Sequence, residues 1–269
     1  MNKNLFFMEM RRNASTLLLW MLVIGLLIAV TMLMYPTFFE NQSKMRGMMS
    51  LVPKGALQFK GISNVNDLLS VLGFYAANNV VYLMLLGSVF SIVLAGNILL
   101  KEEYHKTAEY LLTRPLNRSD IFFSKLSVVY LNIFLLNLVT SSIGLILIVL
   151  VNSGAFRVEA FLILTLYTLL LNFLFAGLGL FISTLVKRAK PITTLLIGMV
   201  LILYFVQTLS KITQSAAAFG YLSPFKYVDM NVLSAKYQLE FWNLLFFVGF
   251  TLLFIGLSYR LYARKDIYV

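Results

Sequence analysis

Six long stretches of apolar residues constrain this chain more than any other feature, because none carries an Asp or Glu in its interior. A helix that crosses a bilayer needs about 20 mostly apolar residues. The stretches cover residues 15–35, 78–100, 121–151, 160–186, 192–210 and 239–262. We therefore predict an all-α integral membrane protein, built as a single transmembrane domain over residues 1–269 with six spans.

The composition agrees with a membrane location. Hydrophobic residues make up 60% of the chain and charged residues 12%, with a mean hydropathy of +0.85, whereas soluble domains carry about 25% charged residues. A net charge of +11 would suggest nucleic acid in a soluble protein, but here the cations flank the spans and form no basic stripe interleaved with aromatics. We expect a multi-pass protein of the cell membrane whose partner is the lipid bilayer. We expect it to bind no nucleic acid.

The distribution of Lys and Arg predicts the orientation. These residues are dense before span one, between spans two and three, at 187–190 and after span six. Loops rich in Lys and Arg face the cytoplasm, so both termini are predicted to be cytoplasmic and residues 36–77 extracellular. Residues 2–13 form either an interfacial helix or a frayed terminus.

The segment after span two, KEEYHKTAEYLLTRPLNRSD, has a helical pattern. Tyr104, Leu111 and Leu112 fall on one helical face, and Pro115 ends the helix. This predicts a cytoplasmic amphipathic helix over residues 101–114. An ordinary solvated loop is the alternative, although the apolar face needs lipid headgroups or a partner protein to cover it.

These features resemble the membrane subunit of type-2 ATP-binding-cassette exporters. That family carries Glu-x-x-Gly-Thr-x-Glu-x-Leu-Leu-x-x-Pro-x-x-Arg after the second span and a lysine in the next span. In this chain Lys106 replaces the glycine, and the six-span layout and the segment Leu222–Tyr227 extend the similarity loosely. The matching positions are Glu103, Thr107, Glu109, Leu111, Leu112, Pro115, Arg118 and Lys125.

The resemblance implies that residues 101–114 are a coupling helix seated in a cleft of a separate ATP-hydrolysing subunit. It also implies two ATP-binding cassette subunits and a second permease, identical or related, as partners, with ATP and Mg held by the cassette. The implied interface residues are Glu102, Glu103, Tyr104, Lys106, Thr107, Glu109, Leu111, Leu112, Pro115 and Arg118.

Motifs for catalysis are missing from the sequence. No G-x-x-x-x-G-K-[ST] occurs, there is no cysteine, and there is one histidine, so neither a phosphate-binding loop nor a soft-metal cluster can be assigned. We predict that the chain is not an enzyme and binds no cofactor or metal of its own.

Small and neutral polar residues lie within the spans. Asn132, Asn137 and Thr140 of span three are candidates for the lining of a translocation path, or they form hydrogen bonds between helices. Small residues spaced four apart in span two (Gly87, Ser91, Ala95) and span four (Gly179, Ser183) predict close packing, either within the chain or at a dimer seam.

Residues 213–238 are too apolar for a free loop. The resemblance implies an outer gate that re-enters the membrane, with Tyr221, Pro224 and Phe225 as candidate gate residues. An aromatic belt at the interface is the alternative.

The first functional hypothesis is therefore an exporter permease for an amphipathic or hydrophobic cargo, such as a peptide, a lipid-like molecule or a drug. A membrane scaffold or sensor that docks a cytoplasmic partner shares the same helix and is the alternative. A secondary transporter is disfavoured, because such proteins keep charged residues inside their spans.

Overall fold

The structure is a computed structural model that describes residues 2–41, 47, 70–104, 117–151, 156–186, 192–212, 214–234 and 237–264. Within these ranges the chain is helical and has no strand, which confirms the all-α fold. The helices are α1 (Lys3–Leu33), α2 (Tyr35–Glu40), α5 (Val71–Tyr75), the π-helical turn η2 (Ala76–Val80), α6 (Val81–Tyr104), α8 (Arg118–Val151), α9 (Val158–Leu185), α10 (Thr193–Ile212), the 3-10 helices η3 (Gln214–Leu222) and η4 (Pro224–Tyr227), and α11 (Phe241–Arg264).

The six predicted spans are confirmed as helices that are long and apolar enough to cross a membrane. The first differs from its predicted bounds, because α1 begins at Lys3 and runs unbroken through the predicted span. The Asn2 side chain caps it by accepting a hydrogen bond from the Leu5 amide at 3.1 Å. Residues 3–13 are therefore the first turns of the spanning helix, rather than a separate interfacial helix or a frayed end.

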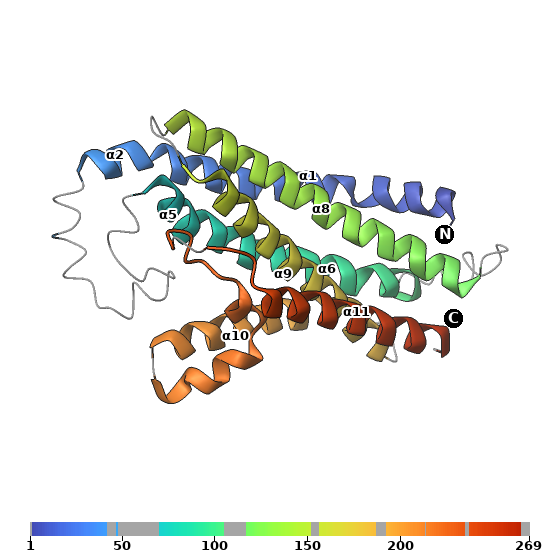
Figure 1. Cartoon of the computed structure of the whole chain (residues 1–269). Helices are drawn as coiled ribbons and strands as arrows, with labels where there is room; N and C mark the ends of the chain where they lie inside the picture. Colours follow the sequence, from blue (N-terminus) through green and yellow to red (C-terminus); the bar gives the residue numbers. More distant parts are fainter. Residues whose placement is uncertain are drawn as a thin grey trace.

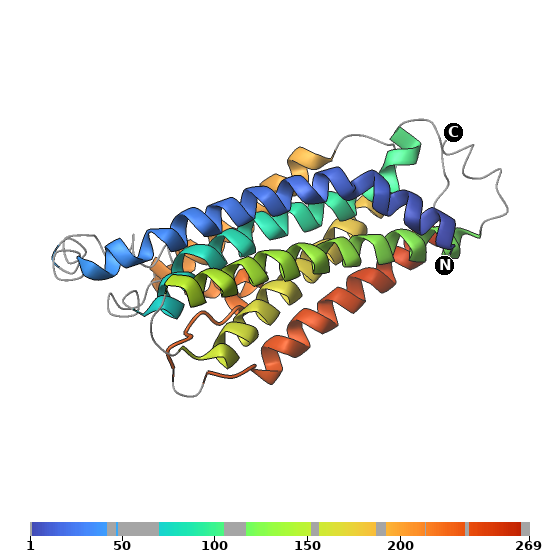
Figure 2. The same cartoon turned by 90° about the horizontal axis from the view of Figure 1, so that it is seen from above.

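The helices form one bundle with α6 and α9 at its centre (Figures 1 and 2). Helix α1 lies along α8, and α11 lies along α9. The start of α1 and the end of α11 lie at the same end of the bundle (Figure 1). This end, where α6 finishes and α8 begins, is called the coupling end below.

Small residues bring α6 and α9 into backbone contact. A β-carbon on Gly179 would lie 2.5 Å from the carbonyl oxygen of Ile92, and Ser91 and Ala95 are fully buried. No side chain larger than hydrogen fits at Gly179 without moving a helix. The small-residue spacing therefore serves packing within one chain at this contact.

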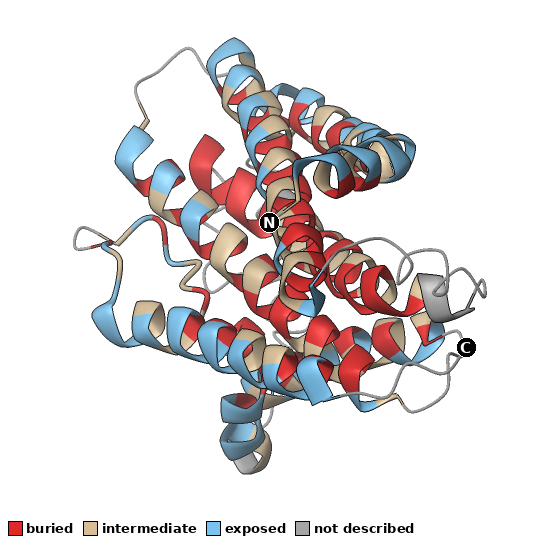
Figure 3. Cartoon of the chain, turned by 90° about the vertical axis from the view of Figure 1, so that its right-hand side faces the viewer, coloured by how far each residue is buried: buried red, intermediate tan, exposed pale blue. Residues whose placement is uncertain are grey.

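Exposed residues lie on the outward faces of the bundle (Figure 3), and many of them are large and apolar. Hydrocarbon is the solvent that such a surface requires, since water would drive these side chains into the core. Examples are Leu18, Leu22 and Leu26 of α1, Leu195, Ile202 and Phe205 of α10, and Trp242, Leu252 and Leu257 of α11.

Candidate functional site

The coupling end holds a buried ion pair between α1 and α6. The Glu9 carboxylate is fully buried and pairs with the Lys101 ammonium, whose side chain is 15% exposed. The Asn13 side chain donates to the Glu9 carbonyl at 2.8 Å. A buried carboxylate is tolerated when a cation compensates it, so this pair holds the first turns of α1 against the last turns of α6.

A fully buried cation, Lys125, joins α8 to the same part of α6. Lys125 is 1% exposed, and its Nζ donates to the carbonyl oxygen of Ile98 at 2.6 Å. Ser124, the residue before it, accepts a hydrogen bond from the backbone amide of Asn2 at 2.9 Å. The end of α6 is therefore bonded to both α1 and α8.

The start of α8 is bonded to the end of α11. The Arg118 guanidinium donates to the carbonyl of Ala263 at 3.2 Å, and the Ser119 and Tyr259 hydroxyls are 2.9 Å apart. The ring of Phe122 packs against the rings of Tyr259 and Tyr262, with centroids 5.4 and 5.7 Å away. The two helices that flank the predicted coupling helix are thus each fixed to a further span.

Most of the predicted ATPase-interface residues lie outside the described residues. Glu102, Glu103 and Tyr104 form the last turn of α6, where the backbone alone is described, and Arg118 opens α8. Outside the described ranges fall Lys106, Thr107, Glu109, Leu111, Leu112 and Pro115. The interface itself stays a prediction.

A chain of neutral polar side chains links three helices inside the bundle. The Ser88 hydroxyl of α6 donates to Asn172 Oδ1 of α9, and Asn172 Nδ2 donates to Asn137 Oδ1 of α8, each at 3.3 Å. Gly87 makes room for this chain, since a β-carbon there would lie 2.6 Å from Asn172 Nδ2. Asn137 therefore helps to hold the bundle together.

The other two candidates for the path are also buried. Asn132 donates to the Val128 carbonyl at 2.7 Å and to Met10 Sδ of α1 at 3.2 Å. Thr140 donates to the carbonyl of Leu136 at 2.7 Å. Asn132 thus contacts α1 whereas Asn137 contacts α9, and a lining role for the three side chains stays a prediction.

Helix η3 turns back along α10, so that the two form a hairpin (Figure 1). Gly220 of η3 lies against Ser210 with no room for a side chain, and the Ser223 hydroxyl donates to the carbonyl of Leu203 at 2.8 Å. Leu203 is nine residues before the end of α10, a distance of about 13 Å along a helix. The chain therefore doubles back along a spanning helix after residue 213.

The predicted gate residues separate into a buried pair and an exposed ring. Pro224 and Phe225 are buried, and the Phe225 ring lies 5.2 Å from that of Phe175 and 5.4 Å from that of Tyr204. Tyr221 is 65% exposed, and the Lys226 ammonium lies 2.9 Å from its ring centroid in a cation–π contact. The 224–227 turn is anchored by Phe225 in the centre of the bundle.

A family comparison identifies the architecture. The model of the ABC-2 family transporter proteins matches residues 7–267, which is nearly the whole chain. The chain belongs to the ABC-2 transporter family. A search of curated proteins found no match to it.

Members of the ABC-2 family are the membrane component of ABC transporters and not the ATPase, so this chain is a multi-pass permease. The family also implies association with ATP-binding cassette subunits. The resemblance drawn from the segment after span two is therefore confirmed at the level of the family.

Sequence reasoning missed Glu9 and Ser88 of the ABC-2 permease. Glu9 precedes the first predicted apolar stretch, and a single acidic residue among exposed cations gave no signal of burial. Its spacing to Asn13, Thr16 and Trp20 places all four on one helical face, which is the pattern that could have revealed it. Ser88 stood out from no other small residue of span two.

The segment of the permease before α11 is held by two hydrogen bonds. The Tyr237 hydroxyl donates to the Asp229 carbonyl at 2.8 Å, and Arg157 donates to the Ser234 carbonyl at 2.7 Å. Burial, and then the nearby Asp229 carboxylate, raises the pKa of Tyr237 above its ordinary value.

Within the ranges that the structure describes, no three His, Cys, Asp or Glu side chains gather into a possible metal site.

Proposed function

We propose that this permease is the membrane half of an ATP-driven exporter, in which a cassette subunit pushes on residues 101–114. The observation that supports this most is the bonding at the coupling end. Lys101 at the start of the segment is paired with Glu9, and Arg118 after it is bonded to the last turn of α11. A displacement of the segment would therefore move four spans.

The buried ion pair gives this motion its stiffness. Removing one partner of a buried pair typically costs about 3–5 kcal/mol, so α1 and the end of α6 move as a unit. Lys125 extends the unit to α8 through the carbonyl of Ile98. A push at residue 101 then tilts these helices instead of bending the last turn of α6.

The proposed cargo is amphipathic or hydrophobic, such as a peptide, a lipid-like molecule or a drug. Support comes from the candidate path residues Asn132, Asn137 and Thr140, which are neutral and buried within a spanning helix that is otherwise mostly apolar. Separation of α8 from α1 and α9 would expose amides that can hydrogen-bond a cargo without binding an ion. Outward release would then pass the 224–227 turn held by Phe225.

A second permease subunit, identical or related, completes the proposed transporter. The hairpin of α10 and η3 presents Phe205, Phe219 and Leu222 on its surface, each more than half exposed. A matching hairpin from the second permease would cover these side chains better than lipid alone, because aromatic side chains give large contact areas.

The test is copurification with a cassette ATPase. Changing Leu111 and Leu112 together to Asp should abolish assembly and the stimulation of ATP hydrolysis, whereas Leu18→Asn, on the exposed face of α1, should leave both intact. Assembly that survives the double change would contradict the coupling role. ATP turnover in proteoliposomes that no amphipathic cargo stimulates would instead favour a scaffold that does not transport.

A further inference from the structure

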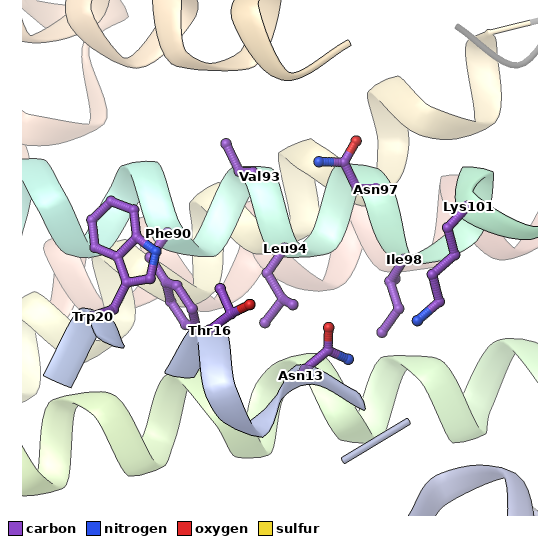
Figure 4. A pocket seen from close by; sticks show the side chains of 9 residues that line it. All are labelled: Asn13, Thr16, Trp20, Phe90, Val93, Leu94, Asn97, Ile98 and Lys101. Carbon is purple, nitrogen blue, oxygen red and sulfur yellow. The ribbon is translucent and has the colours of Figure 1, made fainter. Parts of the chain in front are cut away.

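A groove of about 170 Å³ runs between α1 and α6 at the coupling end (Figure 4). Its walls are two facing stripes of side chains at helical spacing, one on each helix. Asn13, Thr16 and Trp20 come from α1, whereas Phe90, Leu94 and Lys101 come from α6. Asn13 and Thr16 are small for positions that face another helix, so a gap remains where α1 and α6 would otherwise interdigitate.

Two contacts between the helices bound the groove. The rings of Trp20 and Phe90 meet 5.8 Å apart at the end of the groove nearer the middle of the bundle, which is called its inner end. The Glu9–Lys101 ion pair closes the other end, at the coupling end of the bundle, which is called its outer end. Glu9 and Trp20 are eleven positions apart on α1, and Phe90 and Lys101 are eleven positions apart on α6. Eleven positions correspond to about 16 Å along a helix. This length is close to half of a hydrocarbon core of about 30 Å.

Polarity changes along the groove. Trp20, Phe90 and Leu94 make the inner part apolar, and Asn13 and Lys101 make the outer part polar, with the Lys101 side chain turned toward α1 (Figure 4). Thr16 is exposed, so the groove is open to the surrounding lipid. This order of apolar and polar groups matches one leaflet of a phospholipid, from acyl chain to headgroup.

The charge around the outer end selects the headgroup. Glu9 is neutralised by Lys101, whereas Lys3, Arg11 and Arg12, in the first three turns of α1 at the same end of the bundle, are exposed. Exposed cations at the membrane surface attract anionic lipids. The membrane surface beside this end of the groove therefore attracts a headgroup that carries a net negative charge.

We infer that the groove between α1 and α6 is a binding site for an anionic glycerophospholipid, with one acyl chain between Thr16 and Leu94 and the phosphate near Lys101. Such a lipid would support α1 beside the ion pair that fixes it to α6. This inference needs neither the cassette ATPase nor a cargo, so it stands or falls separately from the proposed function.

The experiment uses the full-length permease in nanodiscs with phosphatidylglycerol or phosphatidylcholine, each carrying a photoreactive acyl chain. Labelling mapped by mass spectrometry should concentrate on residues 13–20 and 90–101, and it should be at least threefold stronger with phosphatidylglycerol. Thr16→Trp should lower this labelling at least fivefold. Thr194→Trp, the same change at an exposed position of α10, should leave it unchanged.

The lipid preference has its own pair of variants. Changing Arg11 and Arg12 to Gln should abolish the preference for phosphatidylglycerol, whereas Arg260 and Arg264 to Gln, exposed on α11 at the same end, should keep it. In the unaltered permease, labelling spread evenly over α1, α10 and α11 would mean annular lipid only and would overturn the inference. Disulfide-linked dimers of a Thr16→Cys variant, made in a chain without cysteine, would also overturn it by making the groove a contact between copies.

Discussion

Glu9 and Lys101 are 92 residues apart in the sequence and form an ion pair in which the carboxylate is fully buried. One residue lies in the second turn of α1 and the other in the last turn of α6, where the predicted coupling helix begins. The pair therefore joins the first span to the point at which the cassette is proposed to act.

The two halves of this pair should respond differently to substitution. Lys101→Met leaves the buried Glu9 without its cation, and we expect a loss of about 3–5 kcal/mol in the free energy of unfolding. Glu9→Gln leaves a partly exposed ammonium that reaches water, so it should cost less, about 1 kcal/mol. The double variant should recover most of the loss of Lys101→Met. Denaturant unfolding in detergent checks this, and additive losses would show that the two side chains do not interact.

The contact between Gly179 and Ile92 should not accept a side chain. Gly179→Ala places a β-carbon 2.5 Å from the Ile92 carbonyl and should destabilise the protein by about 1–3 kcal/mol as α6 and α9 separate. Gly249→Ala in α11 is the matched control, since no atom lies within 4 Å of its β-carbon. It should be neutral or raise the melting temperature, because alanine favours helix over glycine by about 1 kcal/mol. A lower melting temperature for Gly249→Ala alone would contradict this packing.

Gly87 and Asn172 should show strong coupling in a double-mutant cycle. Gly87→Ala brings a β-carbon to 2.6 Å from Asn172 Nδ2 and should cost about 1–3 kcal/mol. Asn172→Ala removes the obstructing amide and also the hydrogen bonds to Ser88 and Asn137, at about 1–2 kcal/mol. In the Asn172→Ala background, Gly87→Ala should therefore be nearly neutral. Equal costs in both backgrounds would rule out the contact.

Phe225 should matter far more for stability than Tyr221. Phe225 is buried between Phe175 and Tyr204, and Phe225→Ala should cost about 3–5 kcal/mol. Tyr221→Ala, at an exposed ring four residues earlier, should cost less than about 1 kcal/mol. Thermal unfolding followed by tryptophan fluorescence compares them, and similar losses would mean that the 224–227 turn is not anchored as described.

Tyr237 makes the segment before α11 sensitive to alkaline pH. The pKa of Tyr237 is raised in the folded state. The contribution of its neutral hydroxyl to the free energy of unfolding is therefore fully present below the pKa of an unfolded tyrosine, about 10. That contribution is lost as pH rises through the folded-state pKa. Stability should fall above about pH 10, and Tyr237→Phe should reduce the slope. Urea unfolding at pH 9 and 11 measures this. An unchanged slope would show that another group titrates.

The sequence predicted the number of spans because a spanning helix satisfies its backbone within one segment and needs only length and apolar composition. The same rule misplaced the start of α1, since residues 3–13 contain charges and look polar as a string. Their helix is stabilised by contacts with α6 and α8, such as those of Glu9 and Met10, which no local pattern contains.

The candidate path and gate residues also show that local sequence predicts residue type, whereas contacts distant in the chain decide burial. Asn137 was identified as polar within a span, but whether it faces a path or another helix depends on Asn172 and Ser88, far away in the sequence. Phe225 and Tyr221 are both aromatic residues of one short segment, yet one is buried and the other exposed. The difference follows from the turn of η3 back along α10.

The sequence by itself determined that this permease lies in a lipid bilayer, where its spanning helices are, and to which family it belongs. These properties depend on composition, on residue spacing and on one local motif. The tertiary structure alone decided that Glu9 is buried against Lys101, that Gly179 touches the Ile92 backbone and that a groove remains beside Thr16. Each of these depends on which helix faces which, and in a chain this uniformly apolar almost any face could be turned toward lipid. The few polar and small residues select among those faces, through contacts between residues distant in the chain.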